Sequence, residues 1–146
     1  MINLQDYIIE SANDTKYANM IVVSKDNKIL ILRRANYMKK FKSLWGFPGG
    51  HISKNDNDPK EAAIRELKEE TKIDLSFAEK AHIKEFKNID DTFYYYLVQL
   101  ENDYEVKISK EHSKYEWYSE SSENTYKWMP DVFECIQEYY MNYKEN

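Results

Sequence analysis

Cysteine, glycine and proline are scarce in this chain of 146 residues, which has one cysteine, three glycines and three prolines. The single cysteine, Cys135, excludes an internal disulfide and any zinc site built from several cysteines. It lies in an apolar helical stretch, where we expect it to be part of the core. Apolar runs stay below the roughly 18 residues of a membrane-spanning helix, and the N-terminus has no apolar leader. These absences predict a soluble, cytoplasmic protein with no membrane partner.

Positive charge is also in deficit, because 26 acidic residues face 21 lysines and arginines and give a formal net charge of −5. A nucleic-acid surface needs clustered Lys and Arg, so we expect no DNA partner. An acidic protein that acts on phosphates needs a bound cation. Hydrophobic residues make up 42% of the chain and aromatic residues 15%, which is enough for one core. We therefore expect a single domain over residues 1–146.

Hydrophobic periodicity predicts an alternation of strands and helices. Residues 4–9 could be either a short helix or a strand. The other expected strands are 16–24, 29–34, 81–86, 93–100 and 115–118, and the expected helices are 59–71 and 131–143. The first two strands form a hairpin around the turn at Asp26 and Asn27. Strand 93–100 has apolar or aromatic residues on both faces, as a central or pocket-lining strand has. The order predicts an α/β fold with a mixed sheet between helices.

The helix expected at 59–71 has the clearest start signal in the chain. Asp58 is its N-cap, Pro59 is its first residue, and Glu61 completes a capping box. On this helix Glu66, Glu69 and Glu70 stand at positions i, i+3 and i+4, which share one face.

Three neighbouring carboxylates repel one another unless a cation binds them, and Mg²⁺ prefers oxygen ligands of this kind. Such a run alone is more often a solvated acidic surface. What favours a metal site is Gly49-Gly50 ahead of the helix, since glycines let the backbone approach a ligand closely.

Residues 50–73 resemble the Nudix box, whose pattern is Gly, five residues, Glu, seven residues, Arg-Glu-aliphatic-x-Glu-Glu-x-Gly-aliphatic. The matching residues here are Gly50, Asp56 and Arg65-Glu66-Leu67-Lys68-Glu69-Glu70-Thr71-Lys72-Ile73, after Trp45-Gly46-Phe47-Pro48-Gly49-Gly50. The hairpin before the box, the aromatic strand after it and Glu111-His112-x₄-Trp117 extend the resemblance over most of the chain. This sequence departs from the pattern by one inserted residue and by Lys72 in place of Gly.

The resemblance implies the Nudix α/β/α sandwich and a Mg²⁺-dependent hydrolase, with Mn²⁺ as a possible substitute. Its substrate would be a nucleoside diphosphate linked to another moiety: a (d)NTP, ADP-ribose, a nucleotide sugar or a dinucleoside polyphosphate. By the same resemblance the metal ligands would be Glu66, Glu69, Glu70 and a carbonyl of the glycine pair, taken as Gly49. One of the glutamates could also activate the attacking water.

Arg65 would hold the helix against the loop by pairing with the acidic residue that replaces the first Glu of the box. Asp56, Asn57 and Asp58 compete for this place because of the inserted residue, and we choose Asp56 because Asp58 caps the helix. Lys72 should perturb stability more than catalysis, since the position favours a left-handed backbone. The longer Asp-rich loop also resembles that of coenzyme A-cleaving Nudix enzymes, but their upstream signature is largely missing.

Several residues outside the box are candidates for substrate recognition. Glu111 is either an extra catalytic carboxylate, as metal ligand or general base, or a loop glutamate, and His112 is a weaker candidate. Arg33 and Arg34 face opposite sides of a strand, so only one can reach a phosphate. Tyr94 could stack on a base, although a core role is an alternative. Lys39, Lys40 and Lys42 could add positive potential at the mouth of the cleft, although a solvated loop is the commoner explanation. His51 is near the site but shows no metal-ligand spacing.

Two other functions remain open: removal of RNA 5′ caps, which would make RNA a partner, and nucleotide sensing without catalysis. A homodimer is a further possibility.

Overall fold

The computed structural model describes residues 15–123 and 125–144. Its centre is a seven-stranded mixed sheet of order β3-β2-β1-β6-β5, in which β4 pairs with β1 and β7 with β2. The strands are β1 (Tyr17–Val23), β2 (Ile29–Arg34), β3 (Trp45–Gly46), β4 (Gly49–His51), β5 (Lys84–Ile89), β6 (Phe93–Gln99) and β7 (His112–Tyr118). β1 and β6 run parallel, and the other named strands pair antiparallel.

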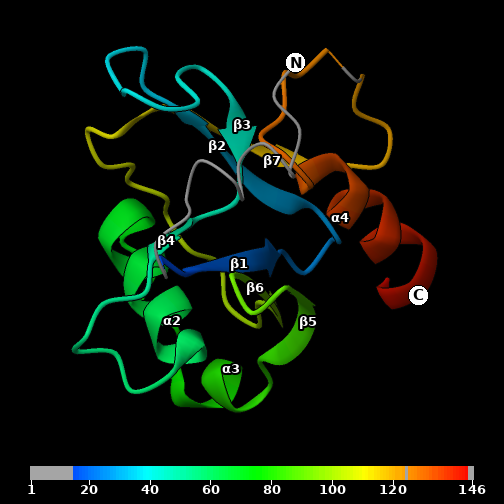
Figure 1. The fold of residues 1–146 in the computed structure, drawn as a ribbon. Helices are drawn as coiled ribbons and strands as arrows, with labels where there is room; N and C mark the ends of the chain where they lie inside the picture. Colours follow the sequence, from blue (N-terminus) through cyan, green and yellow to red (C-terminus); the bar gives the residue numbers. More distant parts are fainter. Residues whose placement is uncertain (1–14, 124, 145–146) are drawn as a thin grey trace.

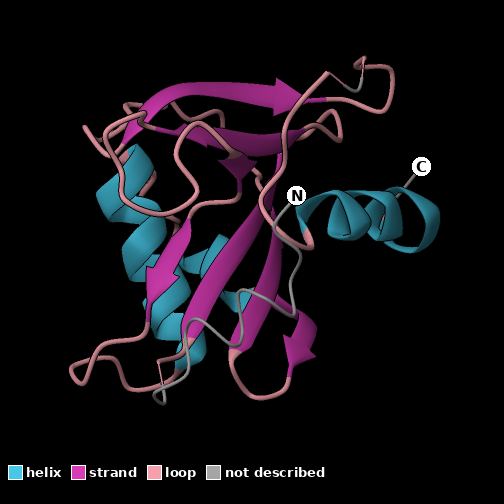
Figure 2. Cartoon of the chain, turned by 45° about the horizontal axis from the view of Figure 1, so that its top comes forward, coloured by secondary structure: helices cyan, strands magenta, loops and turns pink. Residues whose placement is uncertain are grey.

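Helices cover both faces of this sheet (Figures 1 and 2). They are α2 (Pro59–Thr71), α3 (Phe77–Ala81) and α4 (Val132–Glu138), and α4 continues as a π-helical turn, η1 (Tyr139–Tyr143). Residues of α2 share a buried cluster with one face of the sheet, and residues of α4 share another with the opposite face. The expected α/β sandwich with a mixed sheet is therefore confirmed. None of the helices in the described part of the chain is long and apolar enough to cross a bilayer.

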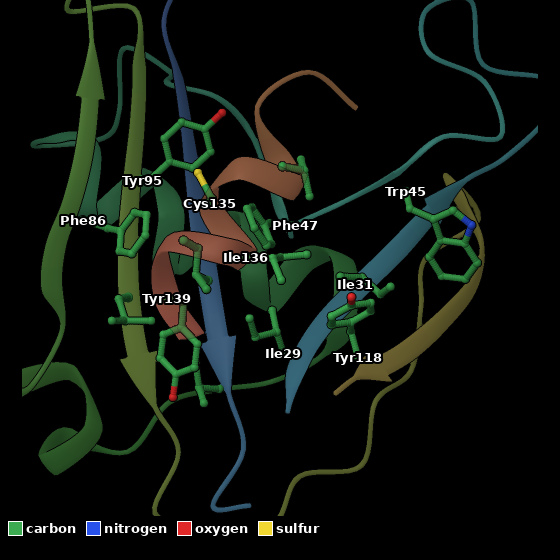
Figure 3. Packing of buried hydrophobic residues seen from close by; sticks show 14 of the residues in the cluster. Ile29, Ile31, Trp45, Phe47, Phe86, Tyr95, Tyr118, Cys135, Ile136 and Tyr139 are labelled. Carbon is green, nitrogen blue, oxygen red and sulfur yellow. The ribbon is translucent and has the colours of Figure 1, made fainter. Parts of the chain in front are cut away.

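The two buried clusters divide the side chains of β6 between them. Phe93, Tyr95 and Leu97 pack on the α4 side, where Cys135 is also buried (Figure 3). Tyr96 and Val98 pack on the α2 side. This alternation confirms the prediction of a central strand with two apolar faces, and the core position of Cys135 is confirmed as well.

The first hairpin opens immediately beyond its turn. β1 and β2 pair at Val23 and Ile29, next to Asn27, whose φ is 62°. Further from the turn, β1 pairs with β4 and β6, while β2 pairs with β3 and β7. The start of β1 and the end of β2 therefore diverge, and residues of both line one cavity.

α2 follows the prediction from the sequence closely. Asp58 caps it by accepting the N–H of Glu61 at 2.8 Å. Only this half of the expected capping box is formed. The helix ends at Lys72, which adopts a left-handed conformation with φ 65° and ψ 9°.

Other elements differ from the prediction. α3 was missed, although Ser76 and Glu79 form a complete capping box. β5 lies three residues later than expected at each end, and β7 begins at His112 rather than at residue 115. β3 and β4 were missed because two or three residues are too few to show a period. Residues 4–9 lie outside the described residues.

Candidate metal centre and substrate cavity

The three glutamates on α2 differ in their exposure. Glu70 is buried with 6% exposure, and its Oε1 accepts the N–H of Gly49 at 2.8 Å. The side chain of Glu66 is 14% exposed and that of Glu69 is 58% exposed. The helix therefore presents a row of carboxylates that runs from the glycine loop outward to solvent.

Glycine at both positions lets β4 lie very close to its neighbours. A Cβ on Gly50 would lie 2.7 Å from both Cδ and Oε1 of Glu66. A Cβ on Gly49 would lie 2.4 Å from Oδ1 of Asn19 and 2.5 Å from the carbonyl oxygen of Ala18. Real side chains essentially never approach so closely. The absence of Cβ atoms is what brings β4 into contact with β1 and with the carboxylates of α2 at once.

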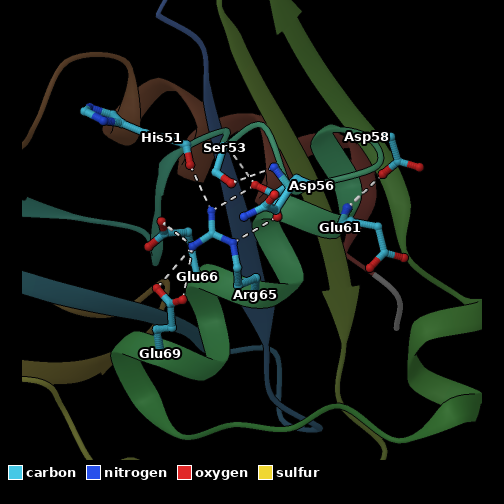
Figure 4. A network of polar contacts seen from close by, with 9 residues as sticks. His51, Ser53, Asp56, Asp58, Glu61, Arg65, Glu66 and Glu69 are labelled. Carbon is cyan, nitrogen blue, oxygen red and sulfur yellow. Dashed lines mark hydrogen bonds and ion pairs between the residues drawn. The ribbon is translucent and has the colours of Figure 1, made fainter.

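Arg65 joins the loop to the helix (Figure 4). Its Nε and Nη2 donate to the two carboxylate oxygens of Asp56 at 2.9 and 3.0 Å, and Nη2 also donates to the carbonyl of His51 at 3.0 Å. Its Nη1 donates to Glu66 at 3.1 Å and to Glu69 at 3.2 Å. The expected pairing of Arg65 with Asp56 is confirmed. The hydrogen bonds with Asp56 raise the pKa of Arg65, and that with Arg65 lowers the pKa of Asp56.

Burial makes the charged form of the two inner carboxylates, Glu66 and Glu70, unfavourable. Burial raises the pKa of Glu70 well above its usual value, and the negative charges of Glu66 and Glu111 raise it further. The hydrogen bond from the N–H of Gly49 and the positive charge of Arg34 lower it, but by less. Burial likewise raises the pKa of Glu66, with Arg65 opposing and the charges of Glu69 and Glu111 adding to the shift. A bound cation would offset the cost of burying these charges and would reduce the repulsion between them.

The donor set fits a hard divalent cation, since it consists of carboxylate oxygens beside a backbone loop. Among the described residues, however, no three acidic, His or Cys side chains already converge as a metal site. Glu66 and Glu69 turn toward Arg65 instead, and Glu70 turns toward Gly49. To bind one cation, the first two carboxylates would have to release Nη1 of Arg65, which would still be held by Asp56.

A cavity of about 630 Å³ adjoins the glycine pair on the α4 side of the sheet. Its positive charge comes from Arg34, Lys39 and Lys40, and no Asp or Glu is among the described residues that line it. Its aromatic lining includes Tyr17, Phe47, Phe93 and Tyr95. In a chain with net charge −5 this is an unusual concentration of positive charge, and it suits an anionic ligand with an aromatic or apolar part.

Comparison with known proteins decides the family. A family model, described as NUDIX domain, matches residues 15–138. The chain belongs to the NUDIX family.

Individual relatives match parts of this Nudix domain. A bis(5′-nucleosyl)-tetraphosphatase (asymmetrical) of Caenorhabditis elegans is 37% identical over 79 residues, which are 50% of this chain and 56% of the relative. An ADP-ribose pyrophosphatase of Methanocaldococcus jannaschii is 42% identical over 50 residues, 34% of this chain and 28% of the relative. The matched segments thus span about half or less of these curated relatives.

Solved structures agree on the fold of the Nudix domain. A MutT protein of Methanosarcina mazei Go1 superposes with a TM-score of 0.63 at 23% identity. The match covers 90% of this chain and 96% of that structure.

The structure decides between the two arginines at the end of β2. Arg34 lines the cavity, and its Nε donates to the carbonyl of Lys40 at 3.0 Å. Arg33 is not among the lining residues, so the expectation that only one of the pair reaches the site holds. Lys39 and Lys40 line the cavity, whereas Lys42 does not.

The substrate role suggested for Tyr94 needs correction. Tyr94 packs against the cluster on the α2 side, whereas the cavity lies on the other face of β6. The aromatic side chains of β6 that reach the cavity are Phe93 and Tyr95. The alternation of side chains along a strand predicts that Tyr94 and Tyr95 point to opposite faces. Which face holds the cavity depends on how α2 and α4, distant in sequence, pack on the sheet.

Glu111 and His112 lie at the start of β7, beside the carboxylate row. Glu111 is exposed, and its charge is close enough to raise the pKa of both Glu66 and Glu70. His112 is buried and lines the cavity, although sequence reasoning ranked it low. No local signal distinguishes it, because its orientation depends on an irregularity in the pairing of β2 with β7.

Proposed function

We propose that this Nudix domain hydrolyses a pyrophosphate bond in a nucleoside diphosphate-linked compound with the help of Mg²⁺ or Mn²⁺. One observation carries the proposal. A row of carboxylates with raised pKa values on Glu66 and Glu70 meets a glycine loop at the edge of a cavity lined by cations. Carboxylates on one side and basic side chains on the other suit a metal-bound diphosphate. The metal would neutralise the negative charge of the phosphates, which the carboxylates would otherwise repel.

Glu66, Glu69 and Glu70 would hold the metal together with the carbonyl of Gly49. The bound metal would screen the charge of the diphosphate and lower the pKa of the attacking water. Arg65 and Asp56 position the site, because their two-pronged pair fixes the loop 52–58 against α2.

The remaining residues act on the substrate and on the proton. Hydrolysis forms a bond between the water oxygen and phosphorus and breaks the bridging P–O bond, so a proton must leave the water. One of the glutamates on α2 could accept this proton, and so could exposed Glu111, whose charge is close enough to raise the pKa of Glu66 and Glu70. Arg34 can hold a phosphate oxygen, and Tyr95 and Phe93 offer apolar surface to a base.

The test is a substrate panel with Mg²⁺, with Mn²⁺ and with EDTA. It contains nucleoside triphosphates, ADP-ribose, a nucleotide sugar, diadenosine tetraphosphate and capped RNA, in ¹⁸O-labelled water so that the attacked phosphorus is identified. Glu69→Gln should lose on the order of 10²-fold or more in rate, as expected when a group acting in the transition state is removed. Glu61→Gln on the same helix is the matched control and should keep full rate.

Hydrolysis of no compound, or equal rates for wild type and Glu69→Gln, would overturn the proposal. Tight nucleotide binding without turnover would instead support a sensor, and turnover of capped RNA alone would support decapping.

A further inference from the structure

The turn that carries Glu111 is tied to the end of α2. This turn runs from Ser109 to His112, and the N–H of His112 closes it by donating to the carbonyl of Ser109 at 3.1 Å. The N–H of Ser109 in turn donates to the carbonyl of Glu70 at 3.0 Å. That carbonyl belongs to the last turn of α2, where carbonyls lack partners within the helix. Glu111 is therefore attached through the backbone to a glutamate of the carboxylate row.

The same turn is tied on its other side to the loop 35–44, which joins β2 to β3. The N–H of Ala35 donates to the carbonyl of Glu111 at 2.9 Å. The hydroxyl of Tyr37 donates to the carbonyl of Lys110, the residue before Glu111. The turn is thus held between α2 and a loop that comes much earlier in the sequence.

Tyr37 makes this contact from an exposed position at the cavity. Its side chain is 62% exposed, so its hydrogen bond adds little to the free energy of unfolding. Residues 37–41 of the same loop line the cavity. The hydroxyl of Tyr37 therefore links the lining of the proposed substrate cavity to the turn that carries Glu111.

The base of the loop 35–44 is held without Tyr37. The N–H of Arg34 donates to the carbonyl of Leu44 at 2.9 Å, and its carbonyl accepts the N–H of Ser43 at 3.0 Å. Its Nε donates to the carbonyl of Lys40 at 3.0 Å. Removal of the hydroxyl of Tyr37 should therefore leave the loop in place and loosen only the turn.

We propose that Tyr37 is a positioning residue, which holds the turn 109–112, and with it Glu111, against the end of the carboxylate row. This rests on the proposed function, in which Glu111 is a candidate acceptor for the proton of the attacking water. Accurate placement matters for such a group, because a proton acceptor must lie within hydrogen-bond reach of the water.

Steady-state kinetics with Mg²⁺, on the compound that the wild type hydrolyses fastest, test this placement. Tyr37→Phe should lower kcat about fivefold, the effect of about one lost hydrogen bond, and leave KM within about twofold. A merely structural role would instead raise KM, because residues 37–41 line the cavity. Tyr115→Phe is the matched control and should keep both constants, since Tyr115 is 41% exposed on β7 and is not among the lining residues.

A double-mutant cycle shows whether Tyr37 acts through Glu111. Glu111→Gln should lower kcat by on the order of 10²-fold. Adding Tyr37→Phe to Glu111→Gln should lower kcat no further, because the group that Tyr37 positions is already gone. Independent effects would instead multiply, and the double variant would be about fivefold slower than Glu111→Gln alone.

Amide hydrogen exchange in EDTA tests the contact without catalysis. In Tyr37→Phe the N–H groups of Ala35 and His112, whose hydrogen bonds hold the turn, should exchange about fivefold faster than in the wild type. The N–H of Leu100, which donates to Val23 in another part of the sheet, should keep its wild-type rate. The variant should melt within about 2 °C of the wild type, because the hydroxyl is at an exposed position.

Multiplying effects in the cycle, full activity in Glu111→Gln, or unchanged exchange of the Ala35 N–H would each overturn the role of Tyr37. With an active wild type, these results would leave the proposed function in place. A wild type that hydrolyses nothing would refute the proposed function, and the exchange rates would still decide whether Tyr37 holds the turn.

Discussion

Glu79 offers the sharpest test of the energetics, because a fully buried carboxylate holds three segments together. Its Oε1 accepts from the N–H of Ser76 at 2.9 Å and from the hydroxyl of Tyr104. Its Oε2 accepts from the N–H groups of Glu101 at 2.8 Å and Asn102 at 3.2 Å. α3 is thereby tied to the segment that follows β6.

The magnitude follows from the pKa. Burial would raise the pKa of Glu79, but the hydrogen bonds from Tyr104 and from the three backbone groups outweigh it and lower the value from 4.5 to about 2. A shift of about 2.5 units corresponds to about 3 kcal/mol of folding stability. Since the folded-state pKa is depressed, this stability is present above pH 5 and is lost as the pH falls from about 5 to about 2.

The perturbation is Glu79→Gln, which keeps the side-chain volume but replaces one accepting carboxylate oxygen by an NH₂ group. That group is itself a donor and cannot accept the backbone N–H bonds. Urea unfolding followed by circular dichroism at pH 7 should show a loss of about 3 kcal/mol, or about 6–12 °C in Tm. The gap between variant and wild type should close as the pH approaches 2, and Glu105→Gln, at an exposed position, should leave stability unchanged. A gap below about 0.5 kcal/mol at pH 7, or one that does not depend on pH, would refute the reasoning.

Two further substitutions test the Nudix helix and its loop. Lys72→Gly should raise the free energy of unfolding by about 1 kcal/mol, because φ 65° suits glycine; an equal or lower value in urea unfolding would contradict this. Gly50→Ala should keep the fold, since the clash at 2.7 Å is with the flexible end of Glu66, but it should lower the hydrolysis rate by on the order of 10²-fold through displacement of that carboxylate. Wild-type activity in Gly50→Ala would show that the close approach of loop and helix is not needed.

Local signals were sufficient for α2 and its neighbourhood. The Asp58 cap, the carboxylate row and the pairing of Arg65 with Asp56 all depend on spacing within one helix and the loop ahead of it. α3 was also within reach, because Ser76 and Glu79 have the spacing of a capping box. It was missed since the helix has only five residues and no apolar period.

The cavity side of the site depends on long-range geometry. Tyr94 and Tyr95 are equivalent in the sequence, and only the packing of α4 and α2 on opposite faces of the sheet separates them. His112 reaches the cavity because of a bulge at Ser113, which the spacing of residues does not reveal. Residue type therefore predicted the chemistry of the site, whereas sheet register decides which side chains take part.

The central claim is that the carboxylate row on α2 binds a divalent cation. Titration of Mn²⁺ followed by electron paramagnetic resonance measures it most directly, because free Mn²⁺ gives a strong signal and bound Mn²⁺ a weak one. Wild type and Glu61→Gln should each bind at least one Mn²⁺, and Mg²⁺ should displace it. Glu70→Gln should lose that site while remaining at least as stable as the wild type at neutral pH, since burial raises the pKa of Glu70. Equal Mn²⁺ binding by wild type and Glu70→Gln would contradict the proposed metal centre.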